Sequence, residues 1–401
     1  MPGVLEGIRV IDMGHVVAVP AAGATLADWG AEVIKVEPLT GEMYRGLVRA
    51  QAMDTPTVNW RFQLLNRNKK CLALDLKQQA GKDILYKLVQ TSDIFISNYE
   101  LSALKNLEMD YETLSKVNPR IVYGVLTGYG KVGPDKDERG FDYAAAWARS
   151  GIMHLMAEPD GIPIPQRGGM MDRAVASHVV GGVLAALLHR EKTGKGQEVE
   201  FSLYQTGVWT LAEDMQVALA TGVELGRHDR AKAGNPLWNN YHARDDRWFW
   251  LAMLQSDLSW PDLCLAMDKP ELQMDPRFNI SRVRAENCEE LISIMDNVFD
   301  TKNRNEWEEI FRKHNVIYGR VDTPLEVIDD PQAKANDFFP TIDHPVAGES
   351  RLVATPVKFP QNPPSTMEPA PEVGQHTEEI LLELGYTWDD IGQLNEQGVI
   401  L

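Results

Sequence analysis

Cysteine is scarce in this chain, with three among 401 residues. Cys71, Cys264 and Cys288 lie far apart, and no two of them have the CxxC spacing of zinc or redox sites. This scarcity excludes a disulfide framework and fits a reducing compartment, so we predict a cytoplasmic protein. Histidines are scattered and show no HExxH or other metal-ligand spacing, so we predict no metal.

Positive charge is also in short supply, because 40 Lys and Arg stand against 58 Asp and Glu, a formal net charge of −18. Nucleic-acid binding needs a basic surface, so we predict no nucleic-acid partner. An anionic ligand must meet a local basic cluster instead. The sequence contains no run of about 18 uncharged apolar residues, so we predict no membrane span. The opening MPGVLEGIRVIDMGHVV lacks the basic flank and apolar block of a signal peptide.

Short apolar runs alternate with helical patterns through the first part of the chain. Buried strands are expected at 7–14, 31–38, 70–77, 93–99 and 120–130. One helix is expected over 101–119, and residues 196–222 indicate a strand leading into one long helix. This βαβα order predicts an α/β protein with a mostly parallel, doubly wound sheet.

The length and a change of pattern near Gly226 predict a second, smaller domain that ends at about residue 325. Helical patterns dominate this part of the chain. After it, a proline-rich stretch over 345–374 is better suited to wrapping another surface than to forming a core. The chain then ends in a predicted helix.

Common nucleotide-binding and catalytic motifs are missing, namely GxxxxGK[ST], GxGxxG in the first βα turn, and GxSxG. The stretch LLNRNKKCLALDLK instead gathers Arg67, Lys69, Lys70 and Lys77 around one strand. Such a cluster suits an anionic ligand at a sheet edge, and it also suits a solvated loop.

Asp172 joins a loop of small residues to an apolar segment with helical spacing. At or just before the helix start, its side chain is predicted to cap exposed N–H groups, and the helix dipole to keep it ionised. A carboxylate nucleophile needs the same ionised state. The residues alone favour the cap.

Several stretches, in this order along the chain, resemble the family III CoA-transferases, which include formyl-CoA transferase, carnitine CoA-transferases and α-methylacyl-CoA racemases. They are LEGIRVIDMGHVVAVPAAGATLADWGAEVIKVEP, NRNKKCLALDLK, SNY, TGYGKVGPDKDERGFDY, MMDRAVASHVVGGVLAALLHREKTGKGQEVEFSL, DPQAKAND and GQHTEEILLELG. The resemblance implies a Rossmann-like large domain formed by both chain ends, a smaller inserted α+β domain and an interlocked dimer. The implied parts are 1–225, 226–325 and 326–401.

The resemblance also implies an acyl-CoA:carboxylate CoA-transferase, with coenzyme A entering as the acyl-CoA substrate. Asp172 takes the place of the catalytic aspartate, which passes through mixed anhydrides and an aspartyl-CoA thioester. The residues implied to bind CoA are Lys69, Lys70, Leu74, Lys77, Asn98 and Arg139. Those implied for the substrate pocket are His15, Val17, Phe141, Asp142 and Trp238.

Three departures from the family pattern narrow the substrate. Val17 and Pro38 stand where formyl-CoA transferase has glutamine and arginine, and KAGNPLWNNY replaces its glycine-rich lid, which disfavours formate and oxalate. The racemases carry a GHD triplet, whereas this chain has GFD, and Phe141 cannot shuttle a proton.

The loop 127–151 is most similar to transferases of aryl-substituted or branched acids, such as phenyllactate, 2-hydroxyisocaproate and benzylsuccinate with succinyl-CoA. The same fold also leaves open a racemase or epimerase, a CoA hydrolase, and one subunit of a heteromeric CoA-transferase. Whether the partner chain is identical or merely related stays open as well.

Overall fold

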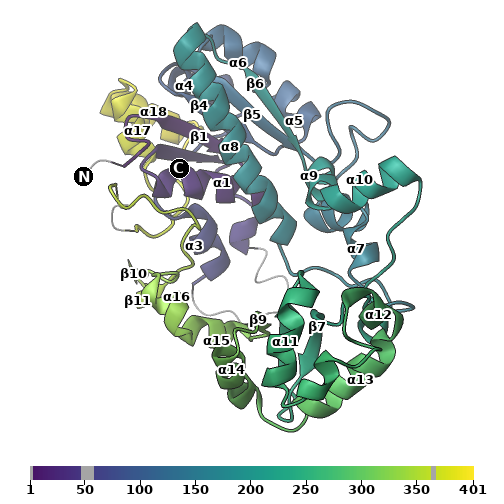
Figure 1. Cartoon of the computed structure of the whole chain (residues 1–401). Helices are drawn as coiled ribbons and strands as arrows, with labels where there is room; N and C mark the ends of the chain where they lie inside the picture. Colours follow the sequence, from purple (N-terminus) through teal and green to yellow (C-terminus); the bar gives the residue numbers. More distant parts are fainter. Residues whose placement is uncertain (1–2, 47–57, 363–366) are drawn as a thin grey trace. The chain divides into compact units, whose positions relative to one another are not determined.

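The computed structural model describes residues 3–46, 58–362 and 367–401. The chain divides into two compact units (Figure 1). The first contains the chain up to Met153, then Pro165–Glu224 and Asp337–Leu401. The second contains His154–Ile164 and Leu225–Asn336.

This division differs at its edges from the predicted inserted part, 226–325. The helices α15 (Pro324–Asp329) and α16 (Pro331–Ala335) belong to the second unit. Ion pairs of Arg247 with Glu326 and of Arg320 with Asp330 connect them to the strand region of that unit. Such long-range pairs leave no local mark in the sequence.

The first unit is built on a six-stranded sheet in the order β3-β2-β1-β4-β5-β6, and all its pairings are parallel. The prediction of a parallel α/β sheet is confirmed. The order reverses between β1 and β4, so the loops after these two strands diverge and leave a crevice at the carboxyl edge. The strands are β1 (Arg9–Met13), β2 (Glu32–Glu37), β3 (Lys69–Ala73), β4 (Ile94–Ser97), β5 (Val122–Thr127) and β6 (Glu198–Ser202).

Helices cover both faces of this sheet. On one face α1 (Ala18–Asp28) packs against α3 (Trp60–Asn66) and α8 (Met170–Thr193), and α8 also packs on β5 and β6. On the other face a continuous apolar core joins the strands to five helices. These are α4 (Gln79–Gln90), α5 (Leu101–Asn106), α6 (Tyr111–Val117), α17 (Thr377–Glu383) and α18 (Trp388–Glu396).

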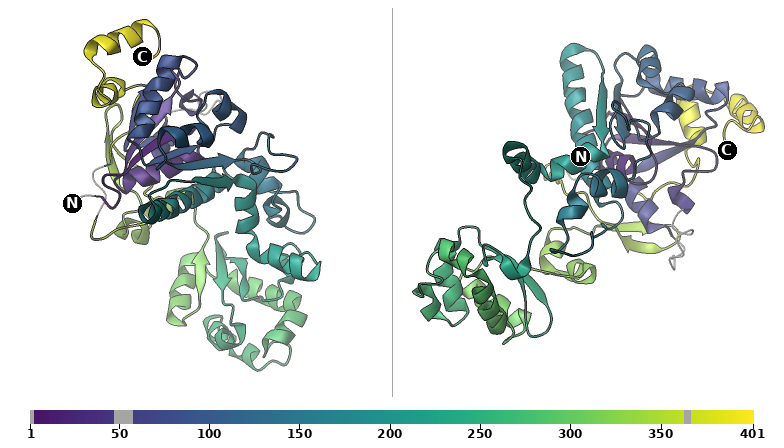
Figure 2. Two further views of the ribbon diagram at one scale, coloured as in Figure 1. Left: turned by 90° about the horizontal axis from the view of Figure 1, so that it is seen from above. Right: turned by 90° about the vertical axis from the view of Figure 1, so that its right-hand side faces the viewer.

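The two ends of the chain meet in this unit, because α17 packs on β3. Figure 2 shows the C-terminal helices in yellow beside the purple N-terminal strands. The backbone N–H of Ala73 donates to Thr377 Oγ1 at 3.3 Å. The C-terminal part of the chain therefore returns to the sheet that the N-terminal part forms.

Two predicted helices are wrong in their continuity. Residues 101–119 form α5 (Leu101–Asn106) and α6, because Glu108 takes a left-handed φ of 62° and Asp110 caps the second helix. The single helix expected before residue 222 is two, α9 (Leu203–Thr210) and α10 (Ala212–Thr221). Helical periodicity continues across both breaks, which is why the pattern did not reveal them.

The stretch 345–374 contains a strand. β11 (Gly348–Arg351) pairs antiparallel with β10 (Thr341–His344) to form a hairpin. Residues 363–366 of this stretch lie outside the described residues.

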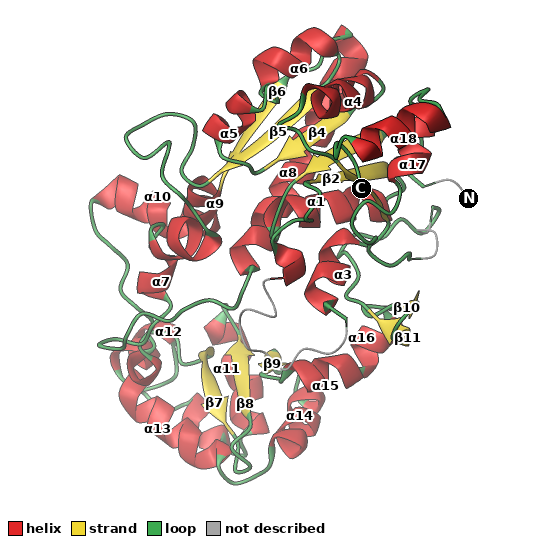
Figure 3. Cartoon of the chain, turned by 180° about the vertical axis from the view of Figure 1, so that it is seen from behind, coloured by secondary structure: helices red, strands yellow, loops and turns green. Residues whose placement is uncertain are grey.

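The second unit is a three-stranded antiparallel sheet packed with helices, drawn in yellow and red in Figure 3. Its strands are β7 (Trp238–His242), β8 (Trp248–Ala252) and β9 (Tyr318–Arg320). Its core joins the inward face of β7 and β8 to the helices. These are α11 (Ser256–Ala266), α13 (Cys288–Phe299) and α14 (Arg304–Lys313), with the short helix η3 (Pro270–Gln273). The unit also contains α12 (Ser281–Glu286) and the short helix η2 (Arg230–Lys232).

By length and composition, α8 would be apolar enough to cross a membrane, and it is the one such helix among the described residues. It packs against α1, β5 and β6 in the first unit. These contacts are those of a core helix, whose apolar composition reflects packing.

Candidate active site

A cavity of about 200 Å³ lies at the point where the strand order reverses. Its walls come from loops far apart in sequence: the loop after β1, the loop after β4, and the end of β5 with the loop that follows it. Asp172 reaches it from α8. The predicted site residues that line it are His15, Val17, Asn98, Arg139, Phe141 and Asp172.

Asp172 is not a helix cap, so that prediction is wrong. Gly169 takes a left-handed φ of 72°, which glycine tolerates, and α8 begins at the next residue, Met170. Asp172 is thus the third residue inside the helix, and the N-cap residue, Gly169, has no side chain that could form a capping hydrogen bond. Asp172 instead lines the cavity.

The electrostatics of Asp172 also differ from the expectation. Burial raises the pKa of Asp172 to about 7, the nearby Asp142 charge adds to the rise, and Arg173 opposes it. The helix dipole does not keep this pKa low, because desolvation of the carboxylate outweighs it. Near pH 7 the group is therefore poised between acid and carboxylate.

Asp142, at the start of η1 (Asp142–Ala148), takes over the role that the sequence assigned to Asp172. Burial raises the pKa of Asp142, while backbone hydrogen bonds from Tyr143, Asp172 and Gly169 and the Gln166 amide oppose the rise. Asp142 therefore receives N–H groups at the start of α8. It is not among the residues that line the cavity, and so lies behind Asp172 instead of in the predicted pocket.

The Asp142 side chain is incompletely satisfied. Asp142 Oδ2 and Gln166 Nε2 are both buried without a hydrogen bond of normal geometry. Gln166 Oε1 accepts the backbone N–H of Met171 at 3.3 Å. The polar groups behind Asp172 thus form a loosely bonded cluster in a dry environment, where unpaired groups are costly and are found at sites of function.

The loop before Asp142 is closed at its base by two glycines. A Cβ on Gly140 would lie 2.6 Å from the Gly128 Cα, so only glycine permits this approach. The closure brings the next residue, Phe141, to the cavity, with 59% of its surface exposed. It also places Arg139 there, whose Nε lies 3.2 Å from Glu100 Oε1.

Two of the residues predicted to bind CoA line a second cavity. Leu74 and Lys77 border it together with the segment 36–40 that follows β2. Tyr99 lines both cavities, so they adjoin each other on either side of this ring.

The contact of Lys69 and Lys70 with CoA stays a prediction, and in this structure both ammonium groups lie in ion pairs. Lys69 is fully buried, and its Nζ donates to Asp12 Oδ2 at 2.7 Å and to three further oxygens. Lys70 Nζ lies 2.9 Å from Glu32 and 2.8 Å from Glu379. Both ammonium groups are already occupied by carboxylates.

Asn98 is also engaged inside the protein. Its amide accepts the N–H of His15 at 2.9 Å and donates to the His15 carbonyl at 3.0 Å. It therefore shapes the loop after β1.

Trp238 lies on β7 in the second unit, with its ring edge toward Trp250 at 5.9 Å between centroids. Its place in the substrate pocket stays a prediction.

Sequence reasoning missed the cavity residues Tyr99 and Glu100, and the buried pair Lys35 and Glu42 beneath the loop after β1. The first two follow directly after a predicted strand, where ligand sites in such sheets occur, so their position was a usable signal. The buried pair had none, since neither residue type predicts burial. Among the described residues no cluster of His, Cys, Asp or Glu could hold a metal ion.

Comparison with known proteins identifies the family and supports the fold. The model of CoA-transferase family III matches residues 5–377. The chain is 31% identical over 402 residues to the (R)-2-hydroxy-4-methylpentanoate CoA-transferase of Clostridioides difficile, covering 99% of each chain. It is 32% identical over 399 residues to the cinnamoyl-CoA:phenyllactate CoA-transferase of Clostridium sporogenes, covering 99% of this chain and 97% of the relative.

A solved structure of a CAIB/BAIF family protein from Brucella suis superposes with a TM-score of 0.84 at 27% identity, covering 96% of this chain and 100% of the other. The family match includes every strand of the sheet that forms the cavity. The chain therefore belongs to CoA-transferase family III and is a CoA-transferase.

Proposed function

We propose that this enzyme moves CoA between organic acids through covalent intermediates on Asp172, with an aryl-substituted or branched acid as one substrate. The observation that carries the proposal is the position of Asp172. Of the four carboxylates that line the cavity, Glu100, Asp137 and Glu138 are exposed, whereas Asp172 is partly buried. A desolvated carboxylate is the stronger nucleophile toward a thioester.

The reaction proceeds by exchange of acyl bonds at Asp172. A carboxylate oxygen of Asp172 attacks the donor thioester carbon, the C–S bond breaks, and a mixed anhydride and CoA thiolate result. The thiolate attacks the Asp172 carbonyl carbon of the anhydride, which expels the donor acid and leaves an aspartyl-CoA thioester. No proton is gained or lost in either step.

The acceptor acid reverses the sequence. Its carboxylate attacks the aspartyl-CoA thioester and expels the thiolate, which then attacks the acceptor carbonyl of the second anhydride. Acyl-CoA leaves and the Asp172 carboxylate is restored. Water at this carbon would hydrolyse the intermediates, so the reaction requires the partly enclosed setting of Asp172.

Binding of CoA is proposed across the two adjoining cavities. Leu74 and Lys77 border one, and Arg139 supplies a cation beside the other. The nucleotide and the reacting thioester would then lie on either side of Tyr99.

The proposed acid class rests on the cavity wall and on the relatives. Val17 and Phe141 give the cavity an apolar side near Asp172. The two relatives above are named for a branched 2-hydroxy acid and for phenyllactate. Phenyllactate, 2-hydroxy-4-methylpentanoate and benzylsuccinate with succinyl-CoA are therefore the first acids to test.

The test is chemical trapping. The enzyme is incubated with cinnamoyl-CoA or succinyl-CoA, quenched with hydroxylamine and digested, and the Asp172 peptide is weighed by mass spectrometry. The proposal expects a hydroxamate at Asp172 in the wild type and none in Asp172→Asn. Full turnover with an unmodified Asp172 peptide would overturn the covalent route.

A racemase or hydrolase of the same fold is separated by the product. A racemase incorporates solvent deuterium next to the thioester carbonyl, and a hydrolase releases CoA without an acceptor acid. Transfer that depends on the acceptor and leaves the substrate undeuterated supports the proposed function.

We also propose that two chains assemble as a dimer, in the cytoplasm. Three large apolar side chains of the α9–α10 region are strongly exposed: Trp209, Leu219 and Val223. Apolar surface of this kind marks contact sites between proteins. Native mass spectrometry of the purified chain measures whether it assembles with itself or requires a related chain.

A further inference from the structure

The loop that joins β1 to α1, residues 14–17, forms the cavity wall next to Asp172. Val17 ends this loop and approaches the start of α8 closely, because a Cβ on Gly169 would lie 3.1 Å from Val17 Cγ1. The position of this loop therefore sets the space between the reacting thioester and the Asp172 carboxylate.

Side chains, not secondary structure, satisfy the backbone of this loop. The N–H of Gly14 donates to Asp12 Oδ1 at 2.9 Å, that of His15 to Asn98 Oδ1 at 2.9 Å, and that of Val16 to Glu42 Oε2 at 3.0 Å. The last two acceptors come from segments after β4 and β2. Three elements thus converge on one short loop.

Val16 adopts a left-handed φ of 64°. A β-branched residue rarely takes this conformation, and such strain persists only where the surrounding structure enforces it. The enforcing contact on its N–H is Glu42, which also accepts the N–H of Tyr44 at 3.2 Å.

Glu42 acts together with Lys35, and we call these two residues the loop clamp. Both are buried, and Lys35 Nζ lies 3.5 Å from Glu42 Oε1. Lys35 Nζ also donates to the Gly14 carbonyl at 2.9 Å. The clamp therefore holds the loop on both sides of His15, at Gly14 and at Val16.

Neither clamp residue lines the cavity. Any effect of the clamp on the reaction passes through the loop. Reacting atoms must approach to about 3–3.5 Å, and a displacement of about 1 Å can cost roughly 100-fold in rate.

We propose that Glu42 is a positioning residue for CoA transfer: with Lys35 it holds Val16 in the left-handed conformation and so fixes the His15–Val17 wall against Asp172. The inference rests on the proposed role of Asp172. The inference is that Glu42, a buried acid that does not line the cavity, affects the rate of acyl exchange.

The test begins with Glu42→Gln, which keeps the size of the side chain and removes its charge. We expect kcat to fall by about 10- to 100-fold while KM for acyl-CoA changes little, because the displaced loop borders the reacting thioester and not the second cavity, lined by Leu74 and Lys77, where the nucleotide is proposed to bind. Single-turnover formation of the aspartyl-CoA adduct, measured by mass spectrometry, should slow by the same factor.

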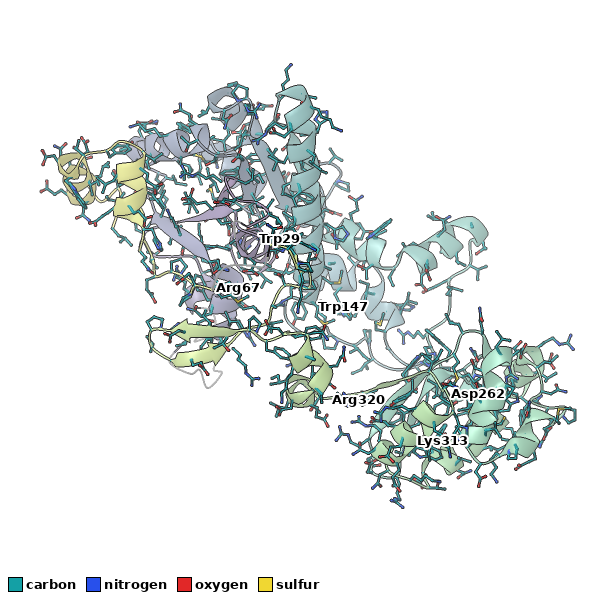
Figure 4. All side chains as sticks on the ribbon, turned by 60° about the vertical axis from the view of Figure 1, so that its left-hand side comes forward. Trp29, Arg67, Trp147, Asp262, Lys313 and Arg320 are labelled. Carbon is teal, nitrogen blue, oxygen red and sulfur yellow. The ribbon has the colours of Figure 1, made fainter. Side chains whose placement is uncertain are left out.

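The matched control is Asp28→Asn. Asp28 is a buried acid paired with Arg67 at 2.6 Å, and it lines none of the described cavities near Asp172 (Arg67 is labelled in Figure 4). The Asp28→Asn variant should have a lower thermal unfolding midpoint and a kcat near that of the wild type. If both variants lose kcat only in proportion to their unfolded fraction, the positioning role is wrong.

Rescue gives the sharper readout. In the Glu42→Gln background, Val16→Gly and Val16→Ala remove nearly the same side chain, but only glycine accepts a left-handed φ freely. We expect Val16→Gly to be faster than Val16→Ala by about tenfold. Equal rates for the two variants would overturn the proposal.

The outcomes also separate this inference from the proposed function. If Asp172→Asn keeps full turnover, the covalent route through Asp172 fails. If Asp172→Asn is inactive while Glu42→Gln forms the adduct at the wild-type rate, the positioning role alone fails.

Discussion

Two regions of the first unit that contain buried ionisable side chains differ in how their charges are paired. Beneath α1, Lys69 is surrounded by four oxygens, among them Asp12 Oδ2 at 2.7 Å. At the cavity, burial and the charge of the nearby Asp142 raise the pKa of Asp172, and Asp142 Oδ2 has no hydrogen bond of normal geometry. In the first region the positive charge of Lys69 is paired with a negative one, whereas in the second region two acidic groups lie close together.

This difference separates structure from chemistry. A buried pair such as Asp12–Lys69 keeps its partners fixed, and removing one partner leaves an uncompensated charge. Carboxylates forced together in a partly dry site have shifted pKa values, which is the condition that catalytic groups require. Substitutions in the first region should therefore reduce stability, and substitutions in the second should reduce the rate of the reaction.

The largest effect is expected at Asp172. Asp172→Asn should reduce the rate of CoA exchange by roughly 10³-fold or more, because the amide cannot form the anhydride. Initial rates are measured by the mass of the product acyl-CoA. A variant that keeps a tenth of the wild-type rate would place the nucleophile elsewhere.

The next effect is on stability. Lys69→Met should lower the free energy of unfolding by about 3–5 kcal/mol, because Asp12 would remain buried without its counter-charge. Urea denaturation at pH 7 measures the loss. The double variant Lys69→Met with Asp12→Asn should recover part of it, and no recovery would mean that packing, not charge, accounts for the loss.

The pH dependence follows from Asp172. Its pKa is raised from 3.8 to about 7, so the folded protein holds a proton over this range that the unfolded chain has released. Stability conferred by this group is therefore lost as the pH rises from about 4 to about 7. Asp172→Asn has no such loss, and the difference in unfolding free energy between the two proteins should change across that window.

The rate moves in the opposite direction. Because the carboxylate is the nucleophile, kcat/KM should rise with pH up to about 7, by about tenfold per pH unit well below that value. A profile that is flat between pH 5 and pH 8 would contradict the raised pKa of Asp172.

The smallest effect is expected at the exposed pair of Arg139 with Glu100, which belongs to neither buried region. Arg139→Ala should change the free energy of unfolding by about 0–1 kcal/mol, as exposed pairs do. If Arg139 contacts CoA, the Arg139→Ala variant should have a higher KM for acyl-CoA and an unchanged unfolding midpoint. An unchanged KM would remove Arg139 from the CoA site.

Much of the fold could be read from local pattern. Runs such as 7–14 and 93–99 are rich in apolar and β-branched residues because parallel strands are buried on both faces, and they form β1 and β4. The breaks at Glu108 and Leu211 were invisible, because helical spacing continues through them. The edges of the second unit depended on ion pairs between distant residues.

The site was predictable in its members more than in their roles. His15, Val17, Arg139, Phe141 and Asp172 do meet at one cavity. The local sequence nevertheless did not show which charged groups are paired inside the protein. Nothing near Lys69 shows that Asp12, 57 residues away along the chain, occupies its ammonium group.

The order of apolar and polar residues along the chain is enough to specify buried parallel strands and the helices between them, because burial and backbone hydrogen bonding act locally. It does not specify which carboxylate remains charged. That is decided when the loops after β1, β4 and β5 and the start of α8 come together, since desolvation and Coulomb forces act through space. The local sequence predicted Asp172 as a helix cap, whereas the tertiary structure makes it a residue of the cavity wall.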